Sequence, residues 1–338
     1  MTPAVFGIAG FELTAEETAF FKDADPAGYI LFARNIGDRE QVRRLTDSLR
    51  ELHGRESLFV SIDQEGGRVA RMRPPHWAEY PAGEVFDRLY AVAPASAIEA
   101  ARINAQAMAM DLYEAGISVD FHPPLDVRQP GAHDVIGDRA LGSEPMQVAA
   151  LGRAIIDGLA RGGVAGCIKH MPGHGRSMCD SHKELPRVHA NDDELEADIA
   201  PFRALNHTPI GMTGHLLFTT WDAENPATLS SKIVSEIIRG RIGFDGLLLT
   251  DDIDMEALGG PVPERAERAI AAGCDLVLNC WAKLEDMHAM ADRLSPASDN
   301  AIDRLNRALD NPQPSGDNLQ TELLARRDAL LAVTEEAA

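Results

Sequence analysis

Short apolar runs recur along the chain, and most of them stop abruptly at a polar residue. They cover residues 5–9, 29–33, 58–62, 117–121, 164–168, 210–213, 247–250 and 276–279. Runs of this length, rich in Val, Ile and Leu, are typical of buried parallel strands. Helical patterns lie between many of them, such as the apolar face formed by Ile98, Ala101, Ala105, Met108 and Leu112. This repetition of strand and helix predicts βαβ units and a parallel sheet.

About eight strands favour a closed barrel over an open doubly wound sheet, so the predicted fold class is α/β, a single TIM-type (β/α)8 barrel that need not be regular. Neither G-x-G-x-x-G nor G-x-x-x-x-G-K-[ST] follows the first run, which further weakens a nucleotide-binding sheet. The 338 residues fit one barrel with insertions. We therefore expect one catalytic domain over residues 1–338, with a C-terminal helical extension that forms a terminal helix at 317–334.

The charge balance and the cysteines exclude several classes of protein. Lys and Arg number 32 and Asp and Glu 53, so the formal net charge is −21, and a nucleic acid or an anionic membrane would be repelled. Four cysteines without C-x-x-C spacing predict no disulfide framework. No apolar run approaches the roughly 18 residues of a membrane span, and the first residues lack the basic region of a signal peptide. We expect a cytoplasmic protein.

Charged and imidazole side chains follow nearly every predicted strand. In a barrel the loops after the strands build the active site, so these residues are its candidates. A barrel without a site has little physical reason for so many of them, because each must be solvated or paired. The candidates are Asp63, Glu65, Arg68, Arg71, Asp126, Arg139, Lys169, His170, His174, Asp180, His182, His215, Asp251 and Asp252.

Two groupings suit acid/base and nucleophilic chemistry. Asp251 ends an apolar strand that aims its carboxylate at the barrel axis, where it suits nucleophilic attack or oxocarbenium stabilisation. The alternative is an N-cap for the following helix. Asp180 and His182, two residues apart, can hydrogen-bond within one turn and form a general acid/base near neutral pH. A purely local structural role for that pair is equally compatible with the spacing.

Five further residues are candidate ligands for a polar substrate. Lys169 and His170 fall together at a strand end, while Asp63 can accept from a pair of hydroxyls and Arg71 and Arg139 can donate as planar groups. Taken singly, each of them is more often structural, as in a salt bridge, than functional. Their shared position at predicted strand ends favours binding.

Five ordered motifs between residues 62 and 255 resemble glycoside hydrolase family 3, and within it the single-domain bacterial β-N-acetylhexosaminidases. The motifs read IDQEGGRV at 62–69, VIGDR at 135–139, KHMPGHG at 169–175, DSH at 180–182 and LTDDIDM at 249–255. The segment GYILFARN at 28–35 is similar to the family as well.

The resemblance implies that Asp251 is the nucleophile and that His182 is the acid/base, with Asp180 as its partner. By the same matching, Asp63, Arg71, Arg139, Lys169 and His170 hold N-acetylglucosamine. The implied reaction is the exo-acting, retaining removal of non-reducing terminal N-acetylglucosamine from anhydro-muropeptides during peptidoglycan recycling. It needs no cofactor and no metal, and the implied partner is this carbohydrate substrate, taken by a monomer.

Three other functions remain open at this stage. A phosphorylase could use the same site, because an imidazole acid would not repel an incoming phosphate dianion. A metal-dependent barrel hydrolase could use His170, His174 and His182 with Asp251, although no H-x-H or H-E-x-x-H spacing supports it. A non-catalytic sugar-binding protein would lack Asp251 and His182, and both are present.

Overall fold

Parallel strands close into a barrel in the computed structural model, which describes residues 1–179, 184–310, 314 and 319–336. Within these residues the barrel order is β1, β2, β3, β4, β5, β7, β9, β10, and β1 hydrogen-bonds to both β2 and β10. The strands are β1 Thr2–Gly7, β2 Pro26–Leu31, β3 Phe59–Ile62, β4 Val119–Asp120, β5 Ala165–Met171, β7 Ile210–Thr213, β9 Leu247–Asp252 and β10 Leu276–Asn279. The predicted (β/α)8 barrel is confirmed, and every predicted apolar run contributes one of these strands.

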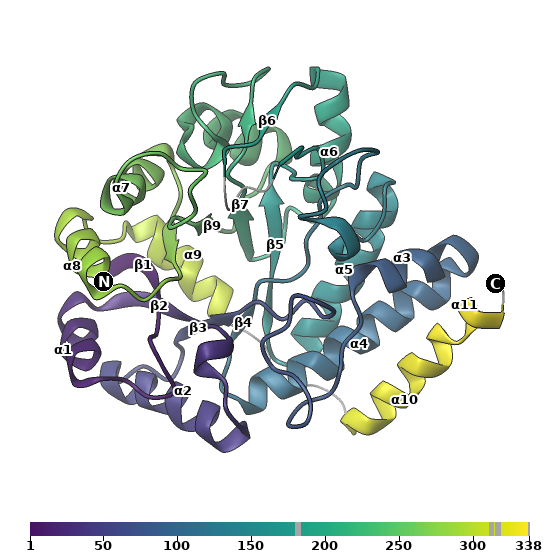
Figure 1. The fold of residues 1–338 in the computed structure, drawn as a ribbon, viewed down its shortest axis with the longest axis horizontal. Helices are drawn as coiled ribbons and strands as arrows, with labels where there is room; N and C mark the ends of the chain where they lie inside the picture. Colours follow the sequence, from purple (N-terminus) through teal and green to yellow (C-terminus); the bar gives the residue numbers. More distant parts are fainter. Residues whose placement is uncertain (180–183, 311–313, 315–318, 337–338) are drawn as a thin grey trace.

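Helices follow the strands and form the outer layer of the barrel (Figure 1). They are α1 Ala15–Ala24, α2 Arg39–His53, α3 Gly83–Val92, α4 Pro94–Glu114, α5 Pro145–Arg161, α6 Asp192–Ala204, α7 Val262–Ala272, α8 Leu284–Arg293 and α9 Asp299–Leu309. A π-helical segment, Ile233–Ile242, takes the place of a helix between β7 and β9. Local sequence sets several of the ends: Thr14 and Glu17 form a capping box on α1, and Asp38 caps α2.

Side-chain alternation along the strands creates two apolar cores. Residues such as Leu247 and Leu249 belong to the cluster inside the barrel, whereas Leu248 between them packs in the larger cluster beneath the helices. Leu305 and Ala308 of α9 join the inner cluster. Because one end of the inner core is filled in this way, a ligand can enter the barrel only from the other end.

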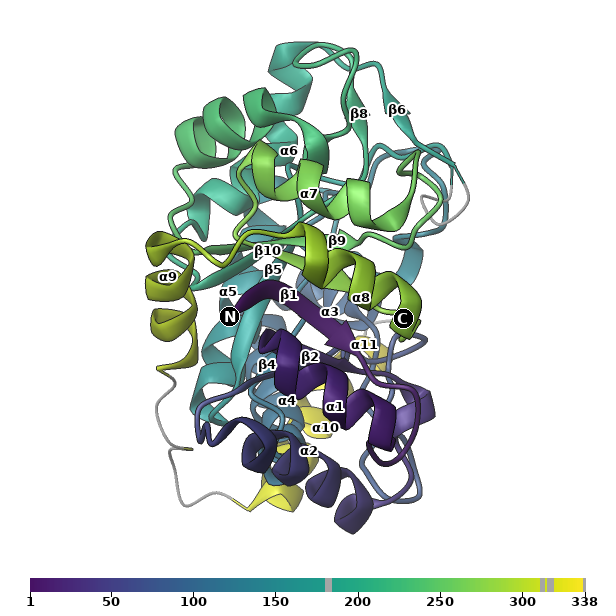
Figure 2. The same ribbon diagram turned by 90° about the vertical axis from the view of Figure 1, so that its left-hand side faces the viewer.

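The chain ends in helices that lie against the outside of the barrel. Helix α10 (Gln320–Leu331) packs on α4 and α3, and α11 (Val333–Glu336) follows it along the same side (Figure 1). The expected terminal helix over 317–334 therefore begins at Gln320 in the described part of the chain and is interrupted at Ala332. Figure 2 shows β1 in front, between the early helices α1 and α2 and the late helix α8, as its pairing with both β2 and β10 requires.

Two strands run further than the apolar pattern indicates. Strand β5 continues through Lys169 and His170 to Met171, and β9 continues through Asp251 to Asp252. Outside the barrel, β6 (Arg187–Val188) and β8 (Leu217–Phe218) pair in parallel and tie the loop after β5 to the loop after β7. Among the described residues, no helix combines the length and the apolarity that crossing a membrane requires.

Candidate active site

A small pocket opens at the carboxyl ends of the barrel strands. Its volume is about 180 Å³, below the roughly 300–1,000 Å³ of pockets that take drug-sized ligands. Seven of the candidates selected from the sequence line it: Asp63, Arg71, Arg139, Lys169, His170, Asp251 and Asp252. Apolar side chains of the inner core, including Phe121, Met212 and Leu278, complete the wall. Two further candidates, Asp180 and His182, lie outside the described residues.

The loop after β3 turns on glycines and fixes Arg71. Gly66 and Gly67 have φ values of 97° and 55°, and a Cβ on Gly66 would collide with the Pro81 carbonyl, so a side chain is not tolerated there. The Gln64 side chain accepts hydrogen bonds from the backbone N–H groups of Arg71 (2.8 Å) and Met72 (3.1 Å). The turn thereby brings Arg71 back over the strand end that carries Asp63.

Asp63 is held as an oriented carboxylate by two cations. Lys169 Nζ donates to Asp63 Oδ1 at 3.0 Å, and Arg71 Nη2 donates to Asp63 Oδ2 at 3.2 Å. Burial alone would raise the pKa of Asp63, but the charges of Lys169 and Arg71 outweigh burial and lower it. Asp63 therefore stays ionised at neutral pH and can accept hydrogen bonds from substrate hydroxyls.

Glu65 holds two cations of the pocket, Arg139 and Lys169, in place, and the sequence patterns did not single it out as a binding residue. Arg139 donates to both of its carboxylate oxygens, at 2.8 and 2.7 Å, and Lys169 Nζ lies 2.7 Å from Oε1. Burial opposes ionisation of Glu65, yet Arg139 and Lys169 keep its pKa well below the usual range. The sequence signal that could have identified Glu65 is its place in a motif at the end of a buried strand, because a buried charge there needs partners of opposite charge.

His170 is oriented from behind by Asp126. His170 Nδ1 lies 2.8 Å from Asp126 Oδ2, and Asp126 Oδ1 accepts from the backbone N–H groups of His170 (3.2 Å) and His174 (2.7 Å). Burial alone would raise the pKa of Asp126, but the neighbouring groups, chiefly His170, outweigh burial and lower it. An ionised carboxylate only accepts hydrogen bonds, so Nδ1 carries the proton. Nε2 of His170 is then the ring nitrogen left for a ligand.

Lys169 and His170 reach the same pocket although they are consecutive in one strand. The pairing of β5 with β7 shifts register between Ile168 and Met171, which breaks the strict alternation of side-chain directions at this point. Both side chains line the pocket as a result.

Asp251 continues the inward-facing side of β9 after Leu247 and Leu249. Its Oδ1 accepts a hydrogen bond from the backbone N–H of Asp252 at 2.8 Å. Burial would raise the pKa of Asp251, but His170, His215, the Asp252 N–H and Lys169 lower it to about 2. The carboxylate is ionised at neutral pH. The alternative role as a helix N-cap is wrong, because α7 begins at Val262 and its N-cap position is Pro261.

His174 packs beside His170 without completing a metal site. The two rings meet edge to face with centroids 5.6 Å apart, and burial together with His170 lowers the pKa of His174 to about 4. In the part of the chain that the structure describes, no three His, Cys, Asp or Glu side chains are grouped so that they could hold a metal ion. The donor set proposed for a metallohydrolase is therefore not assembled by His170, His174 and Asp251 alone.

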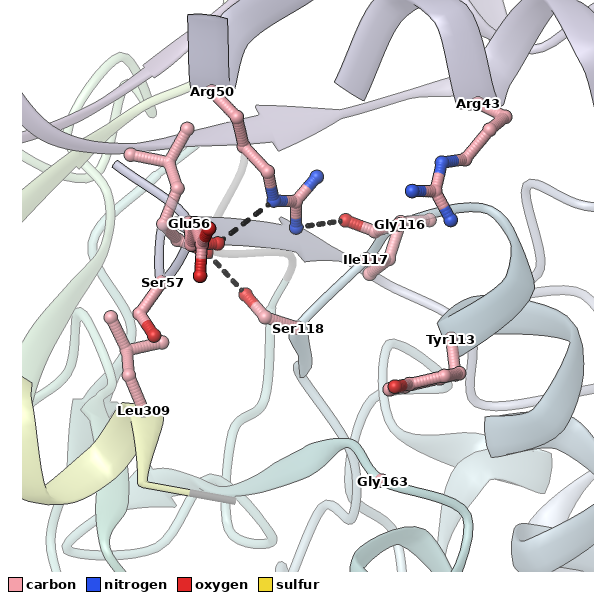
Figure 3. Close-up of a pocket in the computed structure, with 11 residues that line it drawn as sticks. Arg43, Arg50, Glu56, Ser57, Tyr113, Gly116, Ile117, Ser118, Gly163 and Leu309 are labelled. Atoms are coloured by element: carbon pink, nitrogen blue, oxygen red, sulfur yellow. Dashed lines mark hydrogen bonds between the residues drawn. The ribbon is translucent and has the colours of Figure 1, made fainter. Parts of the chain in front are cut away.

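A second pocket, of about 280 Å³, opens beside the opposite ends of β3, β4 and β5 and contains Arg43 and Arg50 (Figure 3). Arg50 donates to the backbone carbonyls of Glu56 (3.1 Å) and Gly116 (2.7 Å), and Arg43 pairs with Asp47. Both guanidinium groups therefore already have partners within the protein. Residues at the amino-terminal ends of barrel strands usually serve stability, so the first pocket is the candidate active site.

Comparison with known proteins agrees with this geometry. Residues 5–310 match the glycosyl hydrolase family 3 N-terminal domain. A β-hexosaminidase of Bordetella avium is 37% identical over 330 residues, which cover 95% of this chain and 92% of the relative. A β-hexosaminidase of Alkalilimnicola ehrlichii is 40% identical over 283 residues, covering 82% and 80%. The crystal structure of NagZ from Neisseria gonorrhoeae in complex with N-trifluoroacetyl-D-glucosamine superposes with a TM-score of 0.87 at 32% identity, covering 98% of both chains.

The fold and the pocket thus define a barrel glycosidase, and the chain belongs to glycosyl hydrolase family 3. Within that family it is an enzyme of the β-hexosaminidase class. The resemblance stated from the motifs is confirmed.

Proposed function

We propose that this enzyme is an exo-acting, retaining β-N-acetylglucosaminidase that releases non-reducing terminal N-acetylglucosamine from anhydro-muropeptides in peptidoglycan recycling. The observation that carries the proposal is the ionised, axis-facing Asp251 in a pocket of about 180 Å³, below the range for drug-sized ligands. A pocket filled from below by the inner core accepts the end of a glycan rather than its middle. This supports exo action.

In the proposed mechanism, Asp251 attacks the anomeric carbon and forms a covalent glycosyl-enzyme. Protonated His182, oriented by Asp180, gives its proton to the leaving oxygen. Neutral His182 then removes a proton from the water that releases the sugar, so two inversions give net retention. A pKa near 6.5 for an unperturbed imidazole suits both steps near neutrality.

Five pocket residues hold the sugar in this proposal. Asp63 and Nε2 of His170 accept from hydroxyls, since the ring proton of His170 lies on Nδ1, and Arg71, Arg139 and Lys169 donate to oxygen atoms of the ring substituents. The support lies in their partners: Asp63, Glu65 and Asp126 hold Lys169, Arg139 and His170 in fixed positions before a ligand arrives. Preorganised donors lower the cost of binding. The N-acylated glucosamine in the relative's structure agrees with a pocket for N-acetylglucosamine.

We also propose that residues 1–338 act as one catalytic domain, as a cytoplasmic monomer without a cofactor. The matched segment reaches residue 310, and α10 packs on α4 and α3 of the barrel rather than standing apart. No partner beyond the carbohydrate substrate is needed for the proposed reaction.

The test combines stereochemistry with trapping. Proton NMR during hydrolysis of a nitrophenyl N-acetyl-β-glucosaminide should show the β-anomer first, and intact-mass spectrometry should find a glycosyl adduct that maps to Asp251. A purified anhydro-muropeptide should lose only its terminal N-acetylglucosamine. First appearance of the α-anomer would overturn the retaining mechanism. Sugar 1-phosphate formed in phosphate buffer would instead identify a phosphorylase.

A further inference from the structure

A fully buried imidazole, that of His215, lies next to the backbone that carries Asp251 and has no role in the proposed chemistry. His215 follows β7, and its side chain has no solvent exposure. Its Nε2 lies 2.9 Å from the backbone carbonyl oxygen of Asp252, and its Nδ1 lies 2.7 Å from Thr228 Oγ1. Both ring nitrogens are therefore engaged.

The hydrogen bonds around His215 have a defined direction. A carbonyl oxygen only accepts, so Nε2 carries the proton. Burial outweighs the neighbouring Asp251 and lowers the pKa of His215, which keeps the ring neutral and leaves Nδ1 as an acceptor. The Thr228 hydroxyl then donates to Nδ1 at 2.7 Å in preference to the Gly214 carbonyl at 3.3 Å, and the Thr213 hydroxyl, 2.8 Å away, donates to Thr228. All three side chains are buried, so no water competes for these bonds.

Asp252 joins this network to the carboxylate of Asp251. Its N–H donates to Asp251 Oδ1 at 2.8 Å, its carbonyl accepts from His215, and its own Oδ1 accepts from the N–H groups of Asp254 (3.1 Å) and Cys280 (3.2 Å). Among the described residues, the Asp252 N–H is the one hydrogen-bond donor to the Asp251 carboxylate. Any rotation of the Asp252 backbone would move that donor.

We propose that His215 is a positioning residue for the nucleophile: through its hydrogen bond to the Asp252 carbonyl it fixes the backbone N–H that orients the attacking carboxylate of Asp251. The proposal rests on the nucleophilic role of Asp251 proposed above. His215 touches neither substrate nor the reacting atoms. Its effect is on the geometry of attack, where a displacement of about 1 Å can cost on the order of 10²-fold in rate.

Two carboxamide variants of His215 distinguish a role in positioning the Asp252 backbone from a role in packing alone. His215→Gln extends an N–H₂ group about as far as Nε2 and can still donate to the Asp252 carbonyl. His215→Asn is one methylene shorter, keeps a polar group near Thr228 and cannot reach Asp252. A second pair, Thr228→Ser and Thr228→Val, keeps or removes the hydroxyl that holds the imidazole tautomer, without a change at His215 itself.

The rate constant for glycosylation is measured from the nitrophenolate burst of each full-length variant, together with the inhibition constant of N-acetylglucosamine and the Tm. We expect His215→Asn and Thr228→Val to slow glycosylation by about 10- to 100-fold, with unchanged affinity for N-acetylglucosamine. His215→Gln and Thr228→Ser should stay within a few-fold of wild type. A purely structural role would lower the Tm of both members of a pair and leave the burst rate of the folded enzyme unchanged.

The inference would be overturned if His215→Asn had the wild-type rate constant for glycosylation, or if His215→Asn and His215→Gln lowered that rate constant equally. If His215→Asn does not fold, the Thr228 pair decides by the same criteria. Asp251→Ala is measured in parallel. Full activity of that variant would refute the proposed nucleophile, whereas an inactive Asp251→Ala with an unaffected His215→Asn would refute only the positioning role.

Discussion

Replacing Glu65 by glutamine removes one charge from the buried cluster of Asp63, Glu65, Lys169 and Arg139 and keeps the shape of the side chain. The Glu65 side chain is 3% exposed and that of Arg139 12%. Removing one partner of a buried ion pair typically costs about 3–5 kcal/mol. Lys169 keeps Asp63 at 3.0 Å, whereas Arg139 keeps only the Val135 carbonyl at 3.2 Å. We therefore expect the lower end, a loss of about 3 kcal/mol in the free energy of unfolding.

A matched control exists on the surface. Like Glu65, Glu196 bridges two cations, here Arg203 and Arg241, each at 2.5 Å, but its side chain is 41% exposed. Because solvent screens exposed pairs, Glu196→Gln should cost less than about 1 kcal/mol. Urea unfolding of both variants gives the two losses directly. With about 2 °C of Tm per kcal/mol in a large domain, Glu65→Gln should melt about 6 °C lower than wild type.

The same substitution should weaken substrate binding, because Arg139 loses the carboxylate that holds its guanidinium. We expect KM to rise more than kcat falls, since Asp251 keeps its own hydrogen bond from Asp252. The double variant Glu65→Gln/Arg139→Met no longer contains the unpaired guanidinium charge. Its loss in the free energy of unfolding should therefore be smaller than the sum of the losses of the two single variants. If Glu65→Gln were no more costly than Glu196→Gln, the assignment of Glu65 as a buried support would be wrong.

Three further predictions follow from the site. His182→Ala should slow glycosylation of a natural disaccharide by about 10²–10⁴-fold and that of a nitrophenyl glycoside far less. Azide should rescue deglycosylation of this variant and give a β-glycosyl azide. Equal slowing of both substrates without an azide adduct would exclude His182 as the acid/base. Burial raises the pKa of Asp120 well above its usual range. The folded state therefore keeps the carboxyl proton to higher pH than the unfolded chain does. As a result, Asp120 destabilises the fold increasingly as the pH rises above about 4. Asp120→Asn should therefore gain stability relative to wild type in urea titrations as the pH rises above about 4, and a difference that does not change with pH would contradict the shift. EDTA should leave the hydrolysis rate unchanged, and a large loss that zinc restores would identify a metallohydrolase.

Local sequence was enough to locate the strands, and several site residues with them. Every apolar run forms a barrel strand, because a buried parallel strand needs a short continuous stretch of apolar residues, whatever its partner is. The direction of Asp251 could be inferred as well, since alternation along β9 places it on the same side as Leu247 and Leu249. The strand ends were set too early at Ile168 and Thr250, because polar residues there continue the backbone pairing as they enter the pocket.

The supports of the site could not be inferred in the same way. Glu65 meets Arg139 across 74 residues of sequence, Asp126 meets His170 across 44, and His215 meets Asp252 across 37. None of these pairs leaves a local pattern, because each exists only once the barrel brings different strand ends together. Sequence alone therefore determined which elements form and which polar groups reach the mouth of the barrel. Tertiary structure decided which charges are paired, which carboxylates stay ionised and which backbone N–H orients Asp251, since these depend on distances that only closure of the barrel sets.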